Sequence, residues 1–354
     1  MASIGMGQSV TTVVEADRLR PVRIWLYCIA LVVLLMVAVG GVTRLTGSGL
    51  SITEWAPISG TLPPLNDAAW QAEFDHYKQI PQYQVNNAGM SMDAFKAIFW
   101  PEWTHRLLGR LLGVLFAVPF LVFLVQRRFS WRLATPLATL FVLGGLQGVL
   151  GWWMVSSGLV KLTSVSQYRL AAHLSAALVL FLALVWVARS LEPAARDAAA
   201  RQTARWPVAV LLLLIMVQVA AGAFVAGLQA GMGYNTWPLM DGAVIPSGLG
   251  AIEPAWRNLF ENALTVQFVH RTIAYVIVLY ALFLFWRQGR AGGFAGVNGW
   301  LPRIGGLILL QVALGITTLL TFVPVPLALG HQALAFILAG ATIAYLSDLT
   351  RLRR

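Results

Sequence analysis

The sequence predicts an all-α polytopic membrane protein with eight transmembrane helices, arranged as two tandem four-helix bundles that are parallel repeats. Three observations predict this fold: the composition, eight long apolar runs and an internal duplication. Of the 354 residues, 58% are hydrophobic and only 11% are charged, whereas soluble domains carry roughly 25% charged and about 45–50% apolar residues. With 14 Trp, 17 Phe and 32 Gly, the chain is also unlike a low-complexity protein. The composition therefore excludes a soluble enzyme.

The basic residues are distributed as in a membrane protein. The net charge is +11, and the 25 Lys and Arg residues lie in short clusters between apolar stretches. That distribution is typical of membrane topology rather than of a phosphate-binding face, so we expect no nucleic-acid partner. The single cysteine, Cys28, can form neither an intrachain disulfide nor a multi-cysteine metal site. The first twenty residues resemble neither a signal peptide nor a transit peptide.

Eight apolar runs are long enough to cross a bilayer, which takes about 20 helical residues. They are residues 23–43, 106–126, 133–154, 170–189, 207–229, 266–286, 302–323 and 327–347. An even number of spans places both termini on one side, and the segments on that side hold most of the basic residues. The positive-inside rule therefore predicts cytoplasmic termini in a bacterial inner membrane (or the equivalent side of a mitochondrial inner membrane). The long connections 44–104 and 230–265 then face outward.

The second half of the chain repeats the first. The matching segments are 40–41 with 221–222, 102–106 with 267–271, 146–151 with 310–315, and 172–173 with 330–331. Because four spans per half preserve orientation, the halves are parallel repeats. We expect an N-terminal segment 1–22, a first bundle 23–190, a linker 191–206, a second bundle 207–348 and a basic tail 349–354. Residues 69–79 are expected to form an amphipathic helix on the membrane surface.

Four of the five histidines occupy repeated positions near the outer ends of even-numbered spans. They are His105, His173, His270 and His331. Ionisable groups at this depth are costly and usually functional, although a single one is also compatible with a packed, carbonyl-bonded histidine. Two histidines per half, without a nearby Cys or Asp, do not suit a closed zinc site. Paired axial imidazoles that hold a haem iron between the helices of each bundle fit the pattern better.

Two arginines and many glycines accompany these histidines. Arg106 and Arg271 each directly follow a histidine, where a guanidinium group matches a haem propionate or anchors the helix at the interface. Glycines along the third and seventh spans would let a flat macrocycle approach, or would serve ordinary helix packing.

One carboxylate distinguishes the two halves. Glu102 lies three residues before His105 and shares its helix face if the helix extends that far, whereas its counterpart is Gln267. This difference indicates chemistry in the first half, with Glu102 as a general acid or base or as a stabiliser of positive charge. The alternative is a first-turn residue favoured by the helix dipole.

A family resemblance is carried by residues 40–52, 54–57, 102–106, 235–240 and the surroundings of His270 and His331. These segments resemble the haem A synthase family, in particular its mitochondrial and alphaproteobacterial branch, and the resemblance covers nearly the whole chain. It implies an enzyme that oxidises the C8 methyl group of haem O to the formyl group of haem A, by successive hydroxylations with water-derived oxygen, for cytochrome oxidase.

The resemblance also implies site residues and partners. By position, the substrate haem lies between His105 and His173 with Glu102 at its reacting edge, and haem b lies between His270 and His331. The implied partners are haem O, the haem O synthase that supplies it, membrane lipid and an unidentified electron acceptor, and homo-oligomerisation stays open. Some members carry a cysteine pair in the external loops, which this chain lacks.

Two other classes compete with the enzyme. A dihaem b-type electron-transfer protein usually has haems near opposite faces of the membrane, whereas these four histidines share one face. A transporter built from repeats is expected to have polar, broken helices at mid-membrane, where this sequence has no ionisable residue.

Overall fold

Eight long helices dominate the computed structural model, which describes residues 3–192, 205–290 and 299–351. They are α1 (Ser3–Leu45), α4 (Met92–Val125), α5 (Trp131–Ser156), α6 (Gln167–Ser190), α7 (Arg205–Gly227), α9 (Ala263–Arg290), α10 (Trp300–Leu320) and α11 (Val325–Arg351). Each is long and apolar enough to cross a membrane, as expected where backbone polar groups must be satisfied within a helix. All eight predicted spans are confirmed, while most of the predicted linker 191–206 lies outside the described residues.

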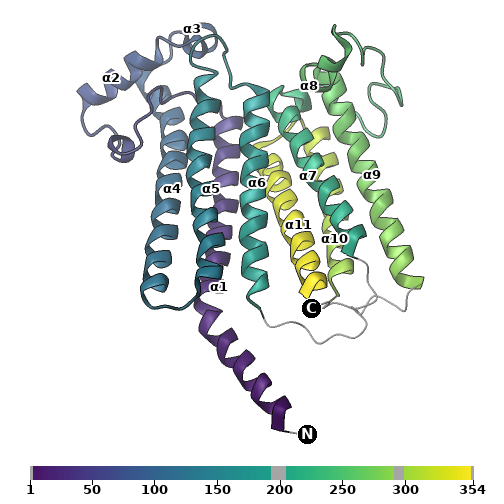
Figure 1. Cartoon of the computed structure of the whole chain (residues 1–354). Helices are drawn as coiled ribbons and strands as arrows, with labels where there is room; N and C mark the ends of the chain where they lie inside the picture. Colours follow the sequence, from purple (N-terminus) through teal and green to yellow (C-terminus); the bar gives the residue numbers. More distant parts are fainter. Residues whose placement is uncertain (1–2, 193–204, 291–298, 352–354) are drawn as a thin grey trace.

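The helices fall into two sets that correspond to the two halves of the chain (Figure 1). In the first set, α1 packs against α4 and α6, and α5 packs against α6. In the second, α7 packs against α9 and α11, and α10 packs against α11. The sets meet where α6 contacts α7 and α11, and where α1 contacts α11. The predicted tandem arrangement of two four-helix sets is thus what the described residues form.

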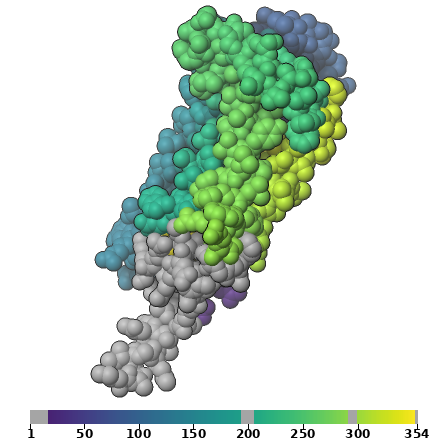
Figure 2. Space-filling model, turned by 90° about the vertical axis from the view of Figure 1, so that its right-hand side faces the viewer, coloured from purple at the N-terminus to yellow at the C-terminus, as the bar shows by residue number. Residues whose placement is uncertain are grey.

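Short helices cover one end of the molecule, opposite the end where α1 begins and α11 ends (Figure 1). They are α2 (Asp67–Tyr77), α3 (Pro81–Asn86) and α8 (Asn258–Glu261). Figure 2 shows the segment between α7 and α9 capping the second half at this end.

The predicted amphipathic helix exists as α2, which begins after Asn66, whose side chain accepts a hydrogen bond from the Ala69 backbone at 2.8 Å. The interpretation that its apolar face rests on the membrane is wrong. Trp70 packs against Phe99 and Phe74 against Phe95, each with ring centroids 4.9 Å apart. This protein surface exists because α4 begins at Met92, well before the predicted span.

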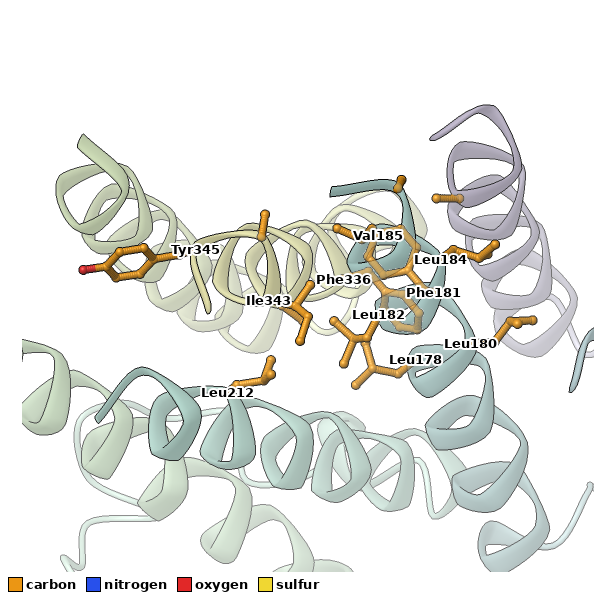
Figure 3. Close-up of a cluster of buried hydrophobic side chains, with 14 of the residues drawn as sticks. Leu178, Leu180, Phe181, Leu182, Leu184, Val185, Leu212, Phe336, Ile343 and Tyr345 are labelled. Carbon is orange, nitrogen blue, oxygen red and sulfur yellow. The ribbon is translucent and has the colours of Figure 1, made fainter. Parts of the chain in front are cut away.

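Apolar side chains fill the contact between the two sets (Figure 3). The rings of Phe181 on α6 and Phe336 on α11 lie 5.6 Å apart. At Gly340 of α11, a Cβ atom would lie 3.0 Å from the Phe181 ring, so this glycine lets the two helices approach closely. Such close packing, rather than hydrophobic expulsion from water, associates helices inside a membrane.

Polar contacts join the halves at the end where α1 ends and α11 begins. The Arg44 guanidinium at the end of α1 donates to the carbonyls of Ala226 and Gly227 at 3.0 and 3.1 Å. These carbonyls belong to the last turn of α7, where a helix lacks internal donors. The Gln332 amide of α11 donates to the Val37 carbonyl of α1 at 2.9 Å. Each contact links one half of the chain to the other.

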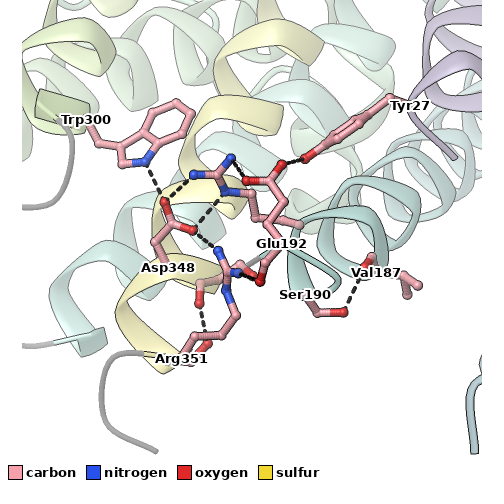
Figure 4. A network of polar contacts seen from close by, with 10 residues as sticks. Tyr27, Val187, Ser190, Glu192, Trp300, Asp348 and Arg351 are labelled. Atoms are coloured by element: carbon pink, nitrogen blue, oxygen red, sulfur yellow. Dashed lines mark hydrogen bonds and ion pairs between the residues drawn. The ribbon is translucent and has the colours of Figure 1, made fainter. Parts of the chain in front are cut away.

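A buried carboxylate joins the halves at the other end (Figure 4). Asp348 of α11 is 1% exposed and accepts two hydrogen bonds from Arg189 of α6, at 2.8 and 2.7 Å. The Trp300 indole of α10 donates to the same carboxylate at 2.9 Å. The remaining members of the network are Arg351, Glu192 and Tyr27. Four helices from both halves therefore meet at one charge network.

Replacing Asp348 with alanine should weaken the contact between the halves. The change leaves Arg189 and Arg351 without their shared anion, and breaking a buried ion pair costs about 3–5 kcal/mol. We expect a large drop in the thermal unfolding temperature of the purified protein. As the control, Asp75→Ala removes the exposed pair with Lys78 and should change little. Equal unfolding temperatures for the two variants would contradict the assignment.

Candidate functional site

Each of the four repeated histidines rests on a glycine of a neighbouring helix. The pairs are His105 with Gly40 of α1, His173 with Gly151 of α5, His270 with Gly222 of α7, and His331 with Gly315 of α10. A Cβ atom on these glycines would lie 3.1, 3.3, 3.1 and 2.7 Å, in that order, from the Cε1 atom of the imidazole. The imidazoles therefore occupy space that any other side chain on the neighbouring helix would fill.

These contacts correct the predicted register of the duplication by one residue. Gly40 and Gly222 are equivalent because each contacts the imidazole of its own half, whereas we had matched Gly41 with Gly222. Gly41 instead packs against α11 of the other half. The corrected register also aligns Gly47 with Gln229, and both have left-handed backbones, with φ of 69° and 52°.

The structure brings the second-half imidazoles together. The ring centroids of His270 and His331 lie 6.4 Å apart, compared with roughly 6 Å for two imidazoles that ligate one metal ion through bonds of about 2 Å. In the first half, His105 and His173 lie within electrostatic range of each other. Each half thus contains one pair of neighbouring imidazoles, contributed by α4 and α6 or by α9 and α11.

The residues around these pairs fit a haem better than a free metal ion. The described residues contain no cluster of three or more His, Cys, Asp or Glu side chains that could hold a metal. A haem needs only two axial ligands from the protein, because the porphyrin supplies the others. The Nδ1 atoms of His105, His173 and His270 are buried without a hydrogen-bond partner, which indicates imidazoles whose polar contacts are incomplete in the protein alone.

Glu102 and His105 both lie within α4, which begins at Met92. The condition for the predicted shared helix face is therefore met. Its side chain is buried, with 3% exposed. One carboxylate oxygen accepts hydrogen bonds from the Ser51 hydroxyl at 2.8 Å and the Ile52 backbone at 2.9 Å. The other accepts from Arg106 at 2.8 Å. Glu102 therefore binds the connection between α1 and α4 to α4 itself.

Arg106 also binds the connection between α1 and α4. Its guanidinium donates to the carbonyls of Ile52 at 2.7 Å and Glu54 at 2.8 Å. One turn further along α4, Arg110 donates to the carbonyls of Ala56 and Pro57 at 2.7 and 2.8 Å. These contacts between α4 and the preceding loop are not predictable from the sequence pattern.

Gln267 and Arg271 reproduce this arrangement in the second half. The Gln267 amide donates to the carbonyls of Ala230 and Gly233, each at 2.9 Å. Arg271 donates to the carbonyls of Tyr234 at 2.6 Å and Thr236 at 2.8 Å. Both halves thus hold the connection that follows their first helix in the same way, but the first half uses the carboxylate Glu102 where the second half uses the amide Gln267. The propionate-binding role of the two arginines stays a prediction.

Aromatic and acidic groups lie near Arg106 and the connection between α1 and α4. The rings of Trp55 and Trp152 lie 5.3 Å apart, and the Arg106 guanidinium lies 5.9 Å from the Trp152 ring. His76 of α2 is 45% exposed, and its Nδ1 atom lies 3.8 Å from Glu54. Burial raises the pKa of the nearby Glu73 carboxyl above its usual range.

A glycine substitution tests the imidazole contact. Gly315→Ala places a methyl group 2.7 Å from the His331 imidazole and should displace the ring, since overpacking costs about 1–3 kcal/mol. We expect less haem per protein in absorption spectra and a lower unfolding temperature. Gly306→Ala on the same helix meets no atom within 4 Å and serves as the matched control. Retention of the full haem content by Gly315→Ala would argue against the contact.

Comparisons with known proteins identify the family. The COX15-CtaA family model, described as "Cytochrome oxidase assembly protein", matches residues 23–343. The "Heme A synthase" of Azorhizobium caulinodans is 53% identical over 343 residues, which cover 96% of this chain and 97% of that protein. The proteins of the same name from Parvibaculum lavamentivorans and Mesorhizobium japonicum are 51% and 52% identical, over 92% of this chain and 94% and 89% of theirs. The chain belongs to the COX15-CtaA family of cytochrome oxidase assembly proteins.

Proposed function

We propose that this protein is a haem A synthase, which oxidises the C8 methyl group of haem O to the formyl group of haem A. The observation that carries the proposal is the difference between Glu102 and Gln267 in two otherwise equivalent halves. A pair of electron-carrying haems needs no such difference, whereas a reaction on one haem needs a distinct group beside it. The name shared by the similar proteins supports the same activity.

The two imidazole pairs have different tasks in this proposal. His105 and His173 hold the substrate haem O and later the product haem A. His270 and His331 hold a haem b, which would supply one-electron redox chemistry when bound. The 6.4 Å separation of the second pair supports this ligand set.

Glu102 acts as a fixed negative charge beside the substrate. Both of its oxygens already accept hydrogen bonds, from Ser51, Ile52 and Arg106, and such a group is better suited to stabilise charge than to carry a proton. Positive charge that develops on the methyl carbon during oxidation with water-derived oxygen would be stabilised by this preorganised carboxylate.

Arg106 and Arg271 contact haem propionates in addition to their loop carbonyls. The Arg271 Nε atom is buried without a partner and is therefore a free donor for a carboxylate. Arg106 has fewer donors to spare, because Nε and both terminal nitrogens already make hydrogen bonds.

The four histidines lie toward the outer side of the membrane, with both termini in the cytoplasm of a bacterial cell. The distribution of basic residues supports this orientation. Haem O would come from the membrane-bound synthase that makes it, and the electrons would leave to an acceptor that is still to be identified.

Glu102→Gln tests the proposal. Glutamine keeps the size and one accepting oxygen but removes the charge, so haem should still bind while formation of haem A falls by roughly 100-fold or more, the loss typical for a preorganised electrostatic group. The measurement is chromatography with mass spectrometry of haem extracted from protein co-expressed with haem O synthase. Asp75→Asn, which removes the charge of an exposed carboxylate, should leave conversion intact.

Two results would count against the enzyme. Full conversion by Glu102→Gln would remove the catalytic assignment. Two haem B molecules per wild-type chain, despite available haem O, would favour the dihaem electron-transfer protein instead.

A further inference from the structure

The helices that carry the four imidazole-contacting glycines share a second feature, one turn before each glycine. That position holds Gln147 before Gly151, Gln218 before Gly222, and Gln311 before Gly315, but Met36 before Gly40. Residues four apart lie on the same face of a helix. Each of these side chains therefore lies beside the imidazole that its glycine contacts, and one of the four differs in chemistry.

The two glutamines of the second half contact their histidines directly. The Gln218 amide nitrogen lies 3.1 Å from the His270 carbonyl oxygen, to which it donates, and 3.3 Å from Nε2 of the ring. The Gln311 amide nitrogen donates to the His331 carbonyl at 3.0 Å and lies 3.3 Å from Nδ1 of that ring. The side-chain oxygens of both glutamines are buried without a hydrogen-bond partner.

These unpartnered oxygens fit a metal-bound imidazole. A histidine that ligates a metal through one ring nitrogen carries a proton on the other, and almost always donates it to a nearby acceptor. His270 Nδ1 is buried without a partner, as is the oxygen of the adjacent Gln218. The Gln218 amide lies against the same imidazole, 3.3 Å from its Nε2, so an unpartnered donor and an unpartnered acceptor belong to two residues in contact.

The first half has only one such residue. Gln147 and His173 repeat the pattern, since the glutamine oxygen and the imidazole Nδ1 are both buried without a partner. His105 Nδ1 is also unpartnered, but the equivalent position on α1, four residues before Gly40, holds Met36. The Met36 methyl group packs on α4, 3.7 Å from where a Cβ of Gly109 would lie. A thioether donates no hydrogen bond and accepts only weakly.

We propose that the three glutamines are positioning residues for the imidazoles beside them. His105 has Met36 at the equivalent position and is therefore held less firmly than the other three histidines. The first half then exchanges its haem by releasing and rebinding at His105, while the second half retains its haem. This inference rests on the proposed function, because a substrate haem must enter and its product must leave, whereas a redox cofactor stays in place.

Reciprocal substitutions at equivalent positions test the inference. Met36→Gln adds the missing amide, and Gln218→Met removes one from the second half. The full-length, haem-loaded protein is mixed with excess apomyoglobin, and haem transfer is followed by visible absorption. The wild type should show a fast phase from the first half and a slow phase from the second. Loss of an outer-shell partner typically changes affinity by roughly 10–100-fold, so Met36→Gln should slow the fast phase, and Gln218→Met should accelerate the slow one, by factors in that range.

Met36→Leu, which adds no amide, should leave both phases at their wild-type rates. A folded Met36→Gln protein with an unchanged fast phase would overturn the inference. If Met36→Gln does not fold, an unchanged slow phase in Gln218→Met overturns it instead. Transfer rates are measured whether or not haem A forms. Wild-type conversion with unaltered rates in both variants therefore contradicts this inference alone, whereas the expected rates without any haem A contradict the proposed function alone.

Discussion

The close contact between each imidazole and a glycine of a neighbouring helix fixes the spacing of the helices around both histidine pairs. Each contact joins two helices that are neighbours in the same half: α1 with α4, α5 with α6, α7 with α9, and α10 with α11. A ring that fills the space of a missing side chain is fixed in position only while those helices keep their spacing. The imidazole pairs, and any haem between them, are therefore as well ordered as the helix packing itself.

The polar contacts between the halves hold that spacing at both ends. Arg44 binds the last carbonyls of α7 near the histidines, and at the opposite end Asp348 of α11 accepts hydrogen bonds from Arg189 of α6 and the Trp300 indole of α10. Charged groups at these depths are costly unless they are paired inside the protein. Arg44 and Asp348 both bind polar partners on other helices, and these interactions offset the cost of burying the charges.

Much of the fold, and part of the site, could be predicted from the sequence. Bilayer thickness fixes the length of an apolar run, so all eight spans were recognisable. The extension of α4 was not, because polar residues and Pro101 interrupt the apolar pattern where the helix leaves the span. The four histidines and Glu102 were found by comparing the halves. Gly40 was matched to the wrong residue because two glycines are adjacent there, and only packing shows which one contacts His105. The contacts of Arg106 with the loop could not be predicted, because their acceptors are backbone carbonyls, which every residue type has.

We propose that the two halves form two separate bis-imidazole sites. Low-temperature electron paramagnetic resonance of the oxidised, haem-loaded protein tests it most directly, with His331→Ala as the comparison. We expect two low-spin ferric signals in the wild type and loss of only one of them in the variant. A single low-spin signal in the wild type, or loss of both signals on replacing His331 alone, would contradict it.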